Sequence, residues 1–457
     1  MSQSYEIDMC HGPLFGKIIR FSIPLMLSGI LQLLFNAADI IVVGRFVGST
    51  ALAAVGSTSS LINLLINLFI GVSVGANVLV ARFHGAGRDD EVNETVHTAI
   101  TLSMVSGIFL LILGVTVTRT LLIWMGSPDD VLDQSSLYLK IYFLAMPATL
   151  LYNFGSSILR AVGDTKRPLF YLVTAGIINV FFNLFFVIVC HLGVAGVGLA
   201  TVIAEYISAA LIIRCLMRSQ GCCHLDLHQL GIVKGKLRQI MQIGLPAGMQ
   251  GVVFSLSNVL IQSSINSFGS TAMAGNTASM NIENFIYISM NTFQQTAMSF
   301  TSQNYGAGEE KRIHKVLFIC QGLVISVGLI FGVGAWLAGD TLLSIYLFIG
   351  SQCDSVWKGP NGCNLYGLLF MRHYGYNGGC TSRCRLFADA NDCFSDRCLR
   401  PADCVDFYCV SDSQKSMDVV YFLSNYLDYY RWCSYSLLYS CQKKAITDGK
   451  ESVKIQK

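Results

Sequence analysis

A single carboxylate lies inside the first long apolar stretch of the chain, which runs from Ile18 to Val47. A helix that crosses a membrane needs about 20 mostly apolar residues, so this stretch is long enough to span a bilayer. Asn36 and Asp39 stand three residues apart near its far end, on one side of the predicted helix. A charged carboxylate at the bilayer centre costs roughly 2.5–3.5 kcal/mol and is usually paired or neutralised. The pair predicts a proton or cation site inside a transporter; the alternative is an acid that reaches interfacial water.

The composition of the chain indicates a polytopic membrane protein. Of its 457 residues, 53% are hydrophobic and 13% are charged, against about 25% charged in soluble domains. The net charge of +3 is small and its basic residues are spread over loops, so we expect no nucleic-acid partner. The H-E-x-x-H signature of metal-dependent proteases does not occur, and we expect no enzymatic activity and no cofactor other than a coupling ion.

Apolar runs bounded by glycine, proline and charge predict nine membrane helices before position 350. Their approximate spans are 18–44, 56–82, 94–118, 136–160, 168–190, 195–217, 240–266, 272–301 and 315–338. Basic residues gather in alternate loops, among them Arg82 and Arg88, then Lys166 and Arg167. The positive-inside rule therefore places these loops and the N-terminus in the cytoplasm of a multi-pass protein of the cell membrane.

The chain repeats itself at a spacing of 221 to 222 residues. Pro24 and Asn36 correspond to Pro246 and Asn258. The segment at 82–87, R-F-H-G-A-G, corresponds to Q-N-Y-G-A-G at 303–308. Each unit would hold six helices, and an even number gives the two units the same orientation. We therefore predict an all-α protein of two parallel six-helix bundles: an N-terminal lobe (1–217), a cytoplasmic linker (218–239) and the first half of a C-terminal lobe (240–349).

The apolar pattern ends near Leu347, although the second unit has supplied only three of its six helices. Residues 350–457 hold ten of the 16 cysteines and no apolar run of about 20 residues. The tail is either an appended cysteine-rich domain or an out-of-frame translation. Back-translation in another frame restores apolar runs and a loop resembling Arg160 to Pro168. We therefore interpret 350–457 as out of frame and without a function of its own.

The predicted linker carries the cluster C-C-H-L-D-L-H at 222–228. Cysteine and histidine are zinc ligands, but the cluster lacks the C-x₂₋₄-C spacing of known zinc sites. We therefore expect no metal site in it.

Four motifs in order along about 340 residues resemble the multidrug and toxic compound extrusion (MATE) transporters, bacterial branch. They are F-N-A-A-D-I-I-V-V-G at 35–44, G-V-S-V-G-A-N-V-L-V-A-R-F-H-G-A-G at 71–87, R-A-V-G-D-T-K-R-P at 160–168 and S-Q-N-Y-G-A-G at 302–308. The resemblance implies twelve helices and an antiporter that exports amphipathic or cationic drugs in exchange for H⁺ or Na⁺. Residues 350–457 do not match it.

The resemblance also assigns roles to residues. Asp39 carries the coupling ion with Asn36, and Pro24 lets the first helix bend when the acid is neutralised. Some relatives have Asn-x-x-x-Asp in the fifth helix; here Asn179 and Asn183 occupy these positions, so the second acid is missing and the coupling ion stays open. Thr201 of the sixth helix would join this cation-coupling site.

Two residues of the eighth helix are candidates for binding the drug. Glu283 could attract a cationic substrate and Met290 could line an adaptable cavity; the alternatives are a hydrogen-bonded interhelical acid and simple packing. The expected partners are thus small-molecule drugs and the lipid bilayer. Two other functions stay open: a lipid or oligosaccharide flippase of the same superfamily, or an inactive truncated remnant. A flippase would need a basic cavity for phosphate groups, and the charges found within the membrane are acidic.

Overall fold

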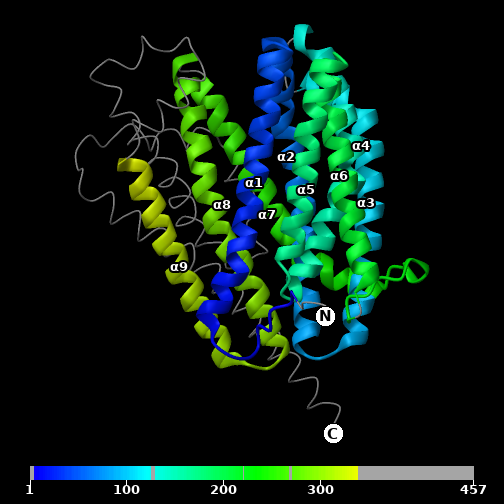
Figure 1. Ribbon diagram of the computed structural model, residues 1–457, viewed down its shortest axis with the longest axis vertical. Coiled ribbons are helices and arrows are strands. Elements are labelled where there is room, and N and C mark those ends of the chain that lie inside the picture. Colours follow the sequence, from blue (N-terminus) through cyan, green and yellow to red (C-terminus); the bar gives the residue numbers. More distant parts are fainter. Residues whose placement is uncertain (1–4, 125–128, 220, 267–269, 338–457) are drawn as a thin grey trace, which may run out of the picture. The chain divides into compact units, whose positions relative to one another are not determined.

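The computed structural model describes residues 5–124, 129–219, 221–266 and 270–337, and these fold into long helices without a strand (Figure 1). The helices are α1 (Leu14–Phe46), α2 (Ser49–Gly85), α3 (Asp89–Trp124), α4 (Asp129–Ala161), α5 (Lys166–Leu184), α6 (Gly193–Arg218), α7 (Lys234–Asn266), α8 (Ser270–Gly306) and α9 (Glu310–Leu337). A π-helix, η1 (Phe185–Val189), continues α5, and a 3₁₀ turn, η2 (Leu227–Gln229), lies in the linker. The predicted all-α fold is confirmed for this part of the chain.

The contacts divide the chain into two units. The first holds residues 1–269 and 283–332, which include α1 to α7 and most of α8 and α9. The second holds 270–282 and 333–457, of which the structure describes only the start of α8 and the end of α9. The tail at 350–457, interpreted above as out of frame, lies outside the described residues, and so does the side chain of Glu283.

All nine predicted helices are present in the described residues, and most are longer than predicted because polar residues extend them at their ends. The helix α7 begins at Lys234, so the segment between α6 and α7 is shorter than the predicted linker. By length and hydropathy alone, six described helices could cross a membrane: α1, α2, α3, α5, α6 and α9. The others, such as α8 with its buried Thr296, Ser299 and Asn304, pair polar groups inside the protein.

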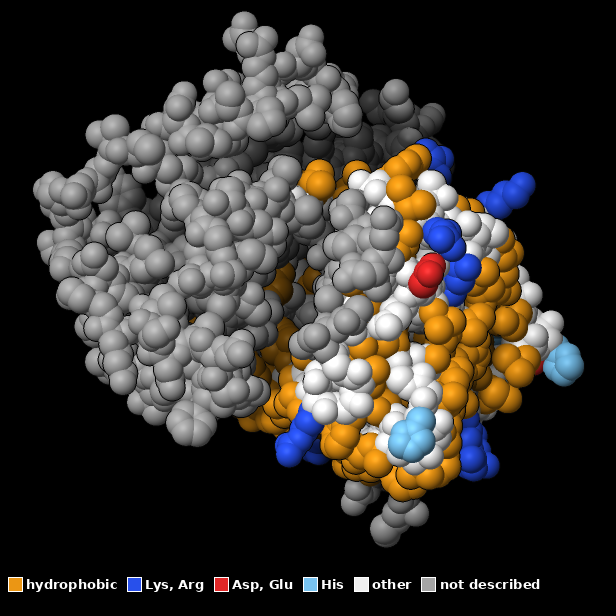
Figure 2. All heavy atoms as spheres, turned by 90° about the horizontal axis from the view of Figure 1, so that it is seen from above, with side chains coloured by type: hydrophobic (Ala, Val, Ile, Leu, Met, Phe, Trp, Pro, Cys, Tyr) orange, Lys and Arg blue, Asp and Glu red, His pale blue; other side chains and the backbone are white. Residues whose placement is uncertain are grey.

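Large apolar side chains cover the outer surface of several helices. On α3 they include Ile108, Phe109 and Ile112, and on α5 they include Ile177 and Phe181, all more than half exposed except Ile108 at half. Figure 2 shows the described surface at one end of the molecule, where apolar side chains predominate and charged groups stand apart. Contiguous apolar surface of this kind marks a membrane interface, since a soluble monomer would bury it.

Helix α1 packs against α8 on both sides of Pro24 and against α5 farther along. Its first turns join a buried cluster in which Phe21 meets Phe300 of α8 with ring centroids 5.5 Å apart. Farther along, Phe35 lies against Gly176 of α5. Proline has no N–H for the helix ladder, which weakens the helix at that point. The predicted bend position therefore lies within the stretch of α1 that contacts α8, because Gly29, beyond Pro24, lies against Ile288 of α8.

The sequence repeat reappears as symmetric contacts between the two halves. Ser22 Oγ of α1 lies 2.9 Å from Thr296 Oγ1 of α8. The repeat equivalents of these residues are Gly244 of α7 and Gly75 of α2, and they also meet: a Cβ on Gly75 would lie 2.8 Å from the Gly244 nitrogen. We call these two contacts the α1–α8 seam and the α2–α7 seam. Small residues let the α2 and α7 backbones approach closely, as at other membrane helix interfaces.

The two G-A-G turns form a second reciprocal contact. Gly85 lies against the backbone of Gln303, and Gly306 lies against the backbone of Arg82, which is the same contact with the repeats exchanged. The last glycine of each turn, Gly87 and Gly308, has a φ of 66° and 76°, a region that favours glycine. The repeat therefore describes a real approximate two-fold relation in this part of the molecule.

One stretch of α2, G-V-S-V-G at 71–75, has the letters of the serine hydrolase motif G-x-S-x-G. That motif needs a strand-to-helix turn, whereas these residues lie within a helix. Ser73 is buried, donates to the Ile70 carbonyl at 2.7 Å and lies 3.3 Å from Ser157 Oγ. The glycines serve the α2–α7 seam, and the serine is not a nucleophile.

Candidate functional site

The carboxyl group of Asp39 contacts the fifth helix, as the sequence predicts. Its Oδ1 accepts a hydrogen bond from Asn183 Nδ2, and Asn183 is 1% exposed. Asp39 lies toward the end of α1 and Asn183 is the second-last residue of α5, just before the π-helix η1. A π-helix changes the direction of the following residues and often occurs at functional sites. The ends of α1 and α5, which are far apart in sequence, therefore meet at the carboxyl group of Asp39.

Asn179 and Thr201 extend this contact into a network, which we call the Asp39 network (Asp39, Asn179, Asn183, Thr201). Asn183 Nδ2 also donates to Asn179 Oδ1 at 3.1 Å, and Asn179 Nδ2 donates to Thr201 Oγ1 at 3.4 Å. Thr201 donates to the Val197 carbonyl of its own helix at 3.1 Å. Four of the five residues predicted for the cation-coupling site are therefore joined by hydrogen bonds across α1, α5 and α6.

One acceptor in the network has no partner. The Oδ1 atom of Asn183 is buried and makes no hydrogen bond in the described residues. A buried polar atom without a partner costs about 1–3 kcal/mol. With the Asp39 carboxylate, Asn179 Oδ1 and Thr201 Oγ1, it gives a set of oxygens of the kind that hard cations prefer. The set could hold either a proton on Asp39 or a Na⁺ ion among several oxygens.

Asn36, by contrast, does not join the network in this structure. Its side chain is exposed and makes no hydrogen bond with the described residues. Residues three apart in a helix differ by about 60° around its axis. That difference lets Asp39 face α5 while Asn36 points away from it.

The two drug-binding candidates on α8 have different outcomes. Met290 is 4% exposed, and a Cβ on Gly328 of α9 would lie 3.6 Å from its sulfur. That contact favours the packing alternative for Met290. The side chain of Glu283 is not described, so its role stays a prediction.

A second acid, Glu205, lies within α6 and outside the Asp39 network. On the neighbouring helix α4, the rings of Tyr138 and Tyr142 lie 6.1 Å apart, as expected for residues one turn apart on a helix.

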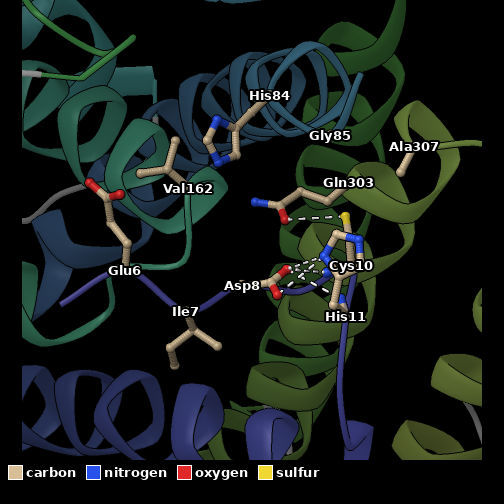
Figure 3. Close-up of a pocket in the computed structure, with 10 residues that line it drawn as sticks. All are labelled: Glu6, Ile7, Asp8, Cys10, His11, His84, Gly85, Val162, Gln303 and Ala307. Carbon is tan, nitrogen blue, oxygen red and sulfur yellow. Dashed lines mark hydrogen bonds and ion pairs between the residues drawn. The ribbon is translucent and has the colours of Figure 1, made fainter. Parts of the chain in front are cut away.

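A pocket of about 370 Å³ lies at the end of the molecule that carries the N-terminus (Figure 3). The N-terminal segment, α2, α4 and α8 supply its walls, and the lining includes Asp8, Cys10, His84 and Gln303. Cys10 Sγ donates to Gln303 Oε1 at 3.9 Å, as the dashed line in Figure 3 shows. None of the predicted site residues lines this pocket.

Comparison with known proteins supports the fold and the class. The MatE family profile matches residues 24–185 and 246–348. The probable multidrug resistance protein YoeA of Bacillus subtilis is 28% identical over 336 residues, 72% of each chain. The FAD transporter of Shewanella oneidensis is 23% identical over 312 residues, 67% of this chain and 69% of that one.

A solved structure shares the fold. It is the outward-facing conformation of a multidrug resistance MATE family transporter of the MOP superfamily. The TM-score is 0.74 at 21% identity, and the match covers 83% of this chain and 84% of that one.

Long apolar helices that place a half-buried acid beside buried amides are typical of a multi-pass membrane transporter. The family match covers more than half of the chain, so the protein belongs to the MatE family. The family resemblance stated from the motifs is thereby confirmed, and the second matched segment ends at 348, next to the position where the sequence pattern ends. Membership points to transport rather than to catalysis.

Proposed function

We propose that this protein is a secondary active antiporter that exports amphipathic or cationic small molecules in exchange for H⁺ or Na⁺. The Asp39 network carries the proposal, because it joins one membrane-embedded acid to buried amide and hydroxyl oxygens. Multidrug resistance relatives support the kind of cargo. One relative is named an FAD transporter, so the efflux test also includes that anionic compound.

The coupling between the cation and the drug follows from the energetic cost of a charged carboxylate in a poorly hydrated site. A carboxylate held among apolar helices loses hydration, and a bound cation cancels much of that cost. Neutralised Asp39 thus favours a conformation in which the site excludes water, and release of the cation favours the reverse. Ion and drug then compete because each stabilises a conformation that the other does not.

Hydrogen bonds between the two repeats support one conformation for the described part. Ser299 Oγ of α8 donates to Asn77 Oδ1 of α2 at 3.1 Å, and Gln303 Nε2 donates to the Ala161 carbonyl at 2.6 Å. These bonds, together with the Ser22–Thr296 pair, join the repeats in the half of the helices near the N-terminus. Asp39 lies in the opposite half of α1. With the N-terminus in the cytoplasm, this is the arrangement expected of a transporter closed toward the cytoplasm.

The test is ion-driven efflux of ethidium from vesicles that contain the full chain. A H⁺ gradient and a Na⁺ gradient are applied separately, and Asp39→Asn is compared with the parent protein. We expect one gradient to drive efflux in the parent and neither to do so in Asp39→Asn. Undiminished efflux by the variant at equal membrane abundance contradicts the site. Competition by FAD in the same assay measures whether an anionic cargo is preferred.

Two controls keep the test clear. Ile41→Ala alters an exposed apolar residue of the same helix outside the predicted site and should retain efflux. The gene is also read through codon 347, and the assay is repeated with any corrected frame, so that a defective tail is not mistaken for a defective site. Whole-cell dye accumulation with the chain as given tests the alternative of an inactive remnant.

A further inference from the structure

Three side chains with metal-binding atoms meet at the end of the molecule that carries the N-terminus. They are His84, Asp89 and Cys222, which we call the Cys222 cluster, and their ligand atoms all lie within 4.8 Å of one another. His84 Nδ1 is 3.4 Å from Cys222 Sγ. In a tetrahedral zinc site, bond lengths near 2.3 Å to sulfur and 2.0–2.1 Å to nitrogen separate the two ligand atoms by about 3.6 Å. The observed spacing therefore suits two ligands of one zinc-like ion.

The fold brings the three residues together from distant parts of the chain. His84 lies in the last turn of α2 and Asp89 is the first residue of α3. The G-A-G turn between them, with Gly87 at a φ of 66°, reverses the chain and places both side chains at one end of the helix pair. Cys222 comes from the segment between α6 and α7.

This segment is held in place by bonds that do not involve the cluster. Asn93 Nδ2 donates to the His224 carbonyl at 2.9 Å, and the Asp226 backbone N–H donates to His97 Nε2 at 3.0 Å. Leu225 is 1% exposed and packs into the main buried cluster. The ligand atoms are therefore positioned before any ion binds, which lowers the ordering cost of binding.

The donor set selects the class of ion. Sulfur and imidazole favour zinc-class cations, whereas Mg²⁺ and Ca²⁺ prefer oxygen. Cys222 and His84 are half-buried and Asp89 is exposed, so an ion can reach the cluster from solvent. Cys223, the next residue in the chain, is buried and is not one of the three clustered ligands. His224, the other histidine next to the cysteines, bonds instead to the Ser219 carbonyl at 3.0 Å.

The charges around the cluster are compatible with a cation. Glu6 acts on His84 and Cys223 from the N-terminal segment, and Figure 3 shows the His84 ring beside the pocket that Glu6 also lines. Arg88, the basic residue next to Asp89 in the sequence, forms an ion pair with Glu91. The negative charge of Glu6 therefore does not oppose the binding of a cation at the Cys222 cluster.

We propose that His84, Asp89 and Cys222 form a binding site for one zinc-class divalent cation, completed by water. The ion would tie the segment after α6 to the ends of α2 and α3. The site is independent of the proposed transport function, since it shares no residue with the Asp39 network. The spacing argument that discounted a metal considered the linker alone, whereas two of these ligands lie outside it.

The experiment is a titration of the purified, metal-free full chain with Co²⁺, followed by displacement with Zn²⁺. The readout is the thiolate-to-cobalt charge-transfer band. Because the tail contains ten further cysteines, the decisive quantity is the difference between the parent protein and Cys222→Ser. We expect this substitution to remove one equivalent of the band, and His84→Ala to weaken its formation by at least about tenfold.

Matched variants keep the result interpretable. Cys320→Ser alters a buried thiol of α9, and His228→Gln alters a histidine of the linker outside the cluster; both should bind as the parent does. Equal thermal unfolding of the metal-free proteins shows that the variants fold. The proposal is overturned if the parent shows no band, or if Cys222→Ser and His84→Ala keep the full band.

Discussion

The molecule contains two polar clusters that both bring together side chains distant in sequence, yet their chemistry differs. The Asp39 network lies among membrane helices and offers one carboxylate with amide and hydroxyl groups. The Cys222 cluster lies at helix ends and offers sulfur, imidazole and one carboxylate. The first set suits H⁺ or Na⁺, and the second suits a zinc-class ion. Both sites contain an acid. Their locations and their donor atoms distinguish the ion proposed to be transported from the ion proposed to stay bound.

The largest expected effect is that a substitution in either cluster abolishes the property of that cluster and leaves the property of the other intact. Asp39→Asn should reduce ion-driven efflux to the level of empty vesicles and leave the cobalt band of the Cys222 cluster intact. Cys222→Ser should do the opposite. Flux and absorbance measured on the same preparations check this prediction. Loss of both properties in either variant would mean that the clusters are coupled or that the fold has failed.

Asn183→Leu sharpens the distinction between H⁺ and Na⁺ within the Asp39 network. It removes a hydrogen bond to a charged group, worth about 1.5–3 kcal/mol, or about 10- to 150-fold in affinity. A proton should then bind more tightly, because the bare carboxylate is less stabilised. Na⁺ should bind more weakly, because an oxygen ligand is lost. Ion dependence of efflux gives the sign, and an unchanged half-maximal concentration would exclude Asn183 from the site.

The thiols at the N-terminal end should differ in their response to pH. Hydrogen bonding from Cys223, aided by His84, lowers the pKa of Cys222 to about 5, whereas burial raises the pKa of Cys10 above its ordinary value. Thiolate is the reactive form, and it predominates above the pKa. Alkylation of Cys222 in metal-free protein should therefore fall about tenfold between pH 7 and pH 4.

Cys10 supplies the internal control for that measurement. Its alkylation should still be rising at pH 9, and peptide mass spectrometry separates the two rates. Equal pH profiles for the two thiols would contradict the hydrogen-bonded Cys222 thiolate.

The smallest expected effect is at the edge of the Asp39 network. Thr201→Val removes a hydroxyl whose bond from Asn179 is long, at 3.4 Å. We expect a change of about two- to fivefold in ion dependence, as for a weak neutral hydrogen bond. Efflux at graded ion concentrations measures it. A loss as large as that of Asp39→Asn would make Thr201 a direct ion ligand in place of a supporting residue.

The sequence is informative about whichever features repeat or follow helix periodicity. Apolar runs predict the nine helices, and the spacing from Pro24 to Pro246 predicts symmetric contacts that the structure contains. Hydropathy is less informative for α8, whose buried side chains include the polar residues Thr296 and Asn304. Helix ends are underestimated for a similar reason, since polar residues continue a helix beyond the membrane.

The Asp39 network and the Cys222 cluster differ in how much of each could be predicted from the sequence. Family motifs indicate Asp39, Asn179, Asn183 and Thr201, and hydrogen bonds join all four. Asn36 points away, because three residues are not quite a full helical turn. For the Cys222 cluster, the sequence indicates only that the tight turn between His84 and Asp89 brings these two residues close together. Nothing local to these residues indicates that Cys222 arrives beside them from more than 130 positions later.

The two seams have a consequence for how the halves can part. They occupy equivalent places in the two repeats, so a rocking motion that separates the halves must open both together. The energetic costs differ, because one seam loses a hydrogen bond between two hydroxyl groups, whereas the other exposes the backbone at Gly75 and Gly244 to water. The free energy needed for opening is therefore shared unequally between two contacts that the repeat makes equivalent.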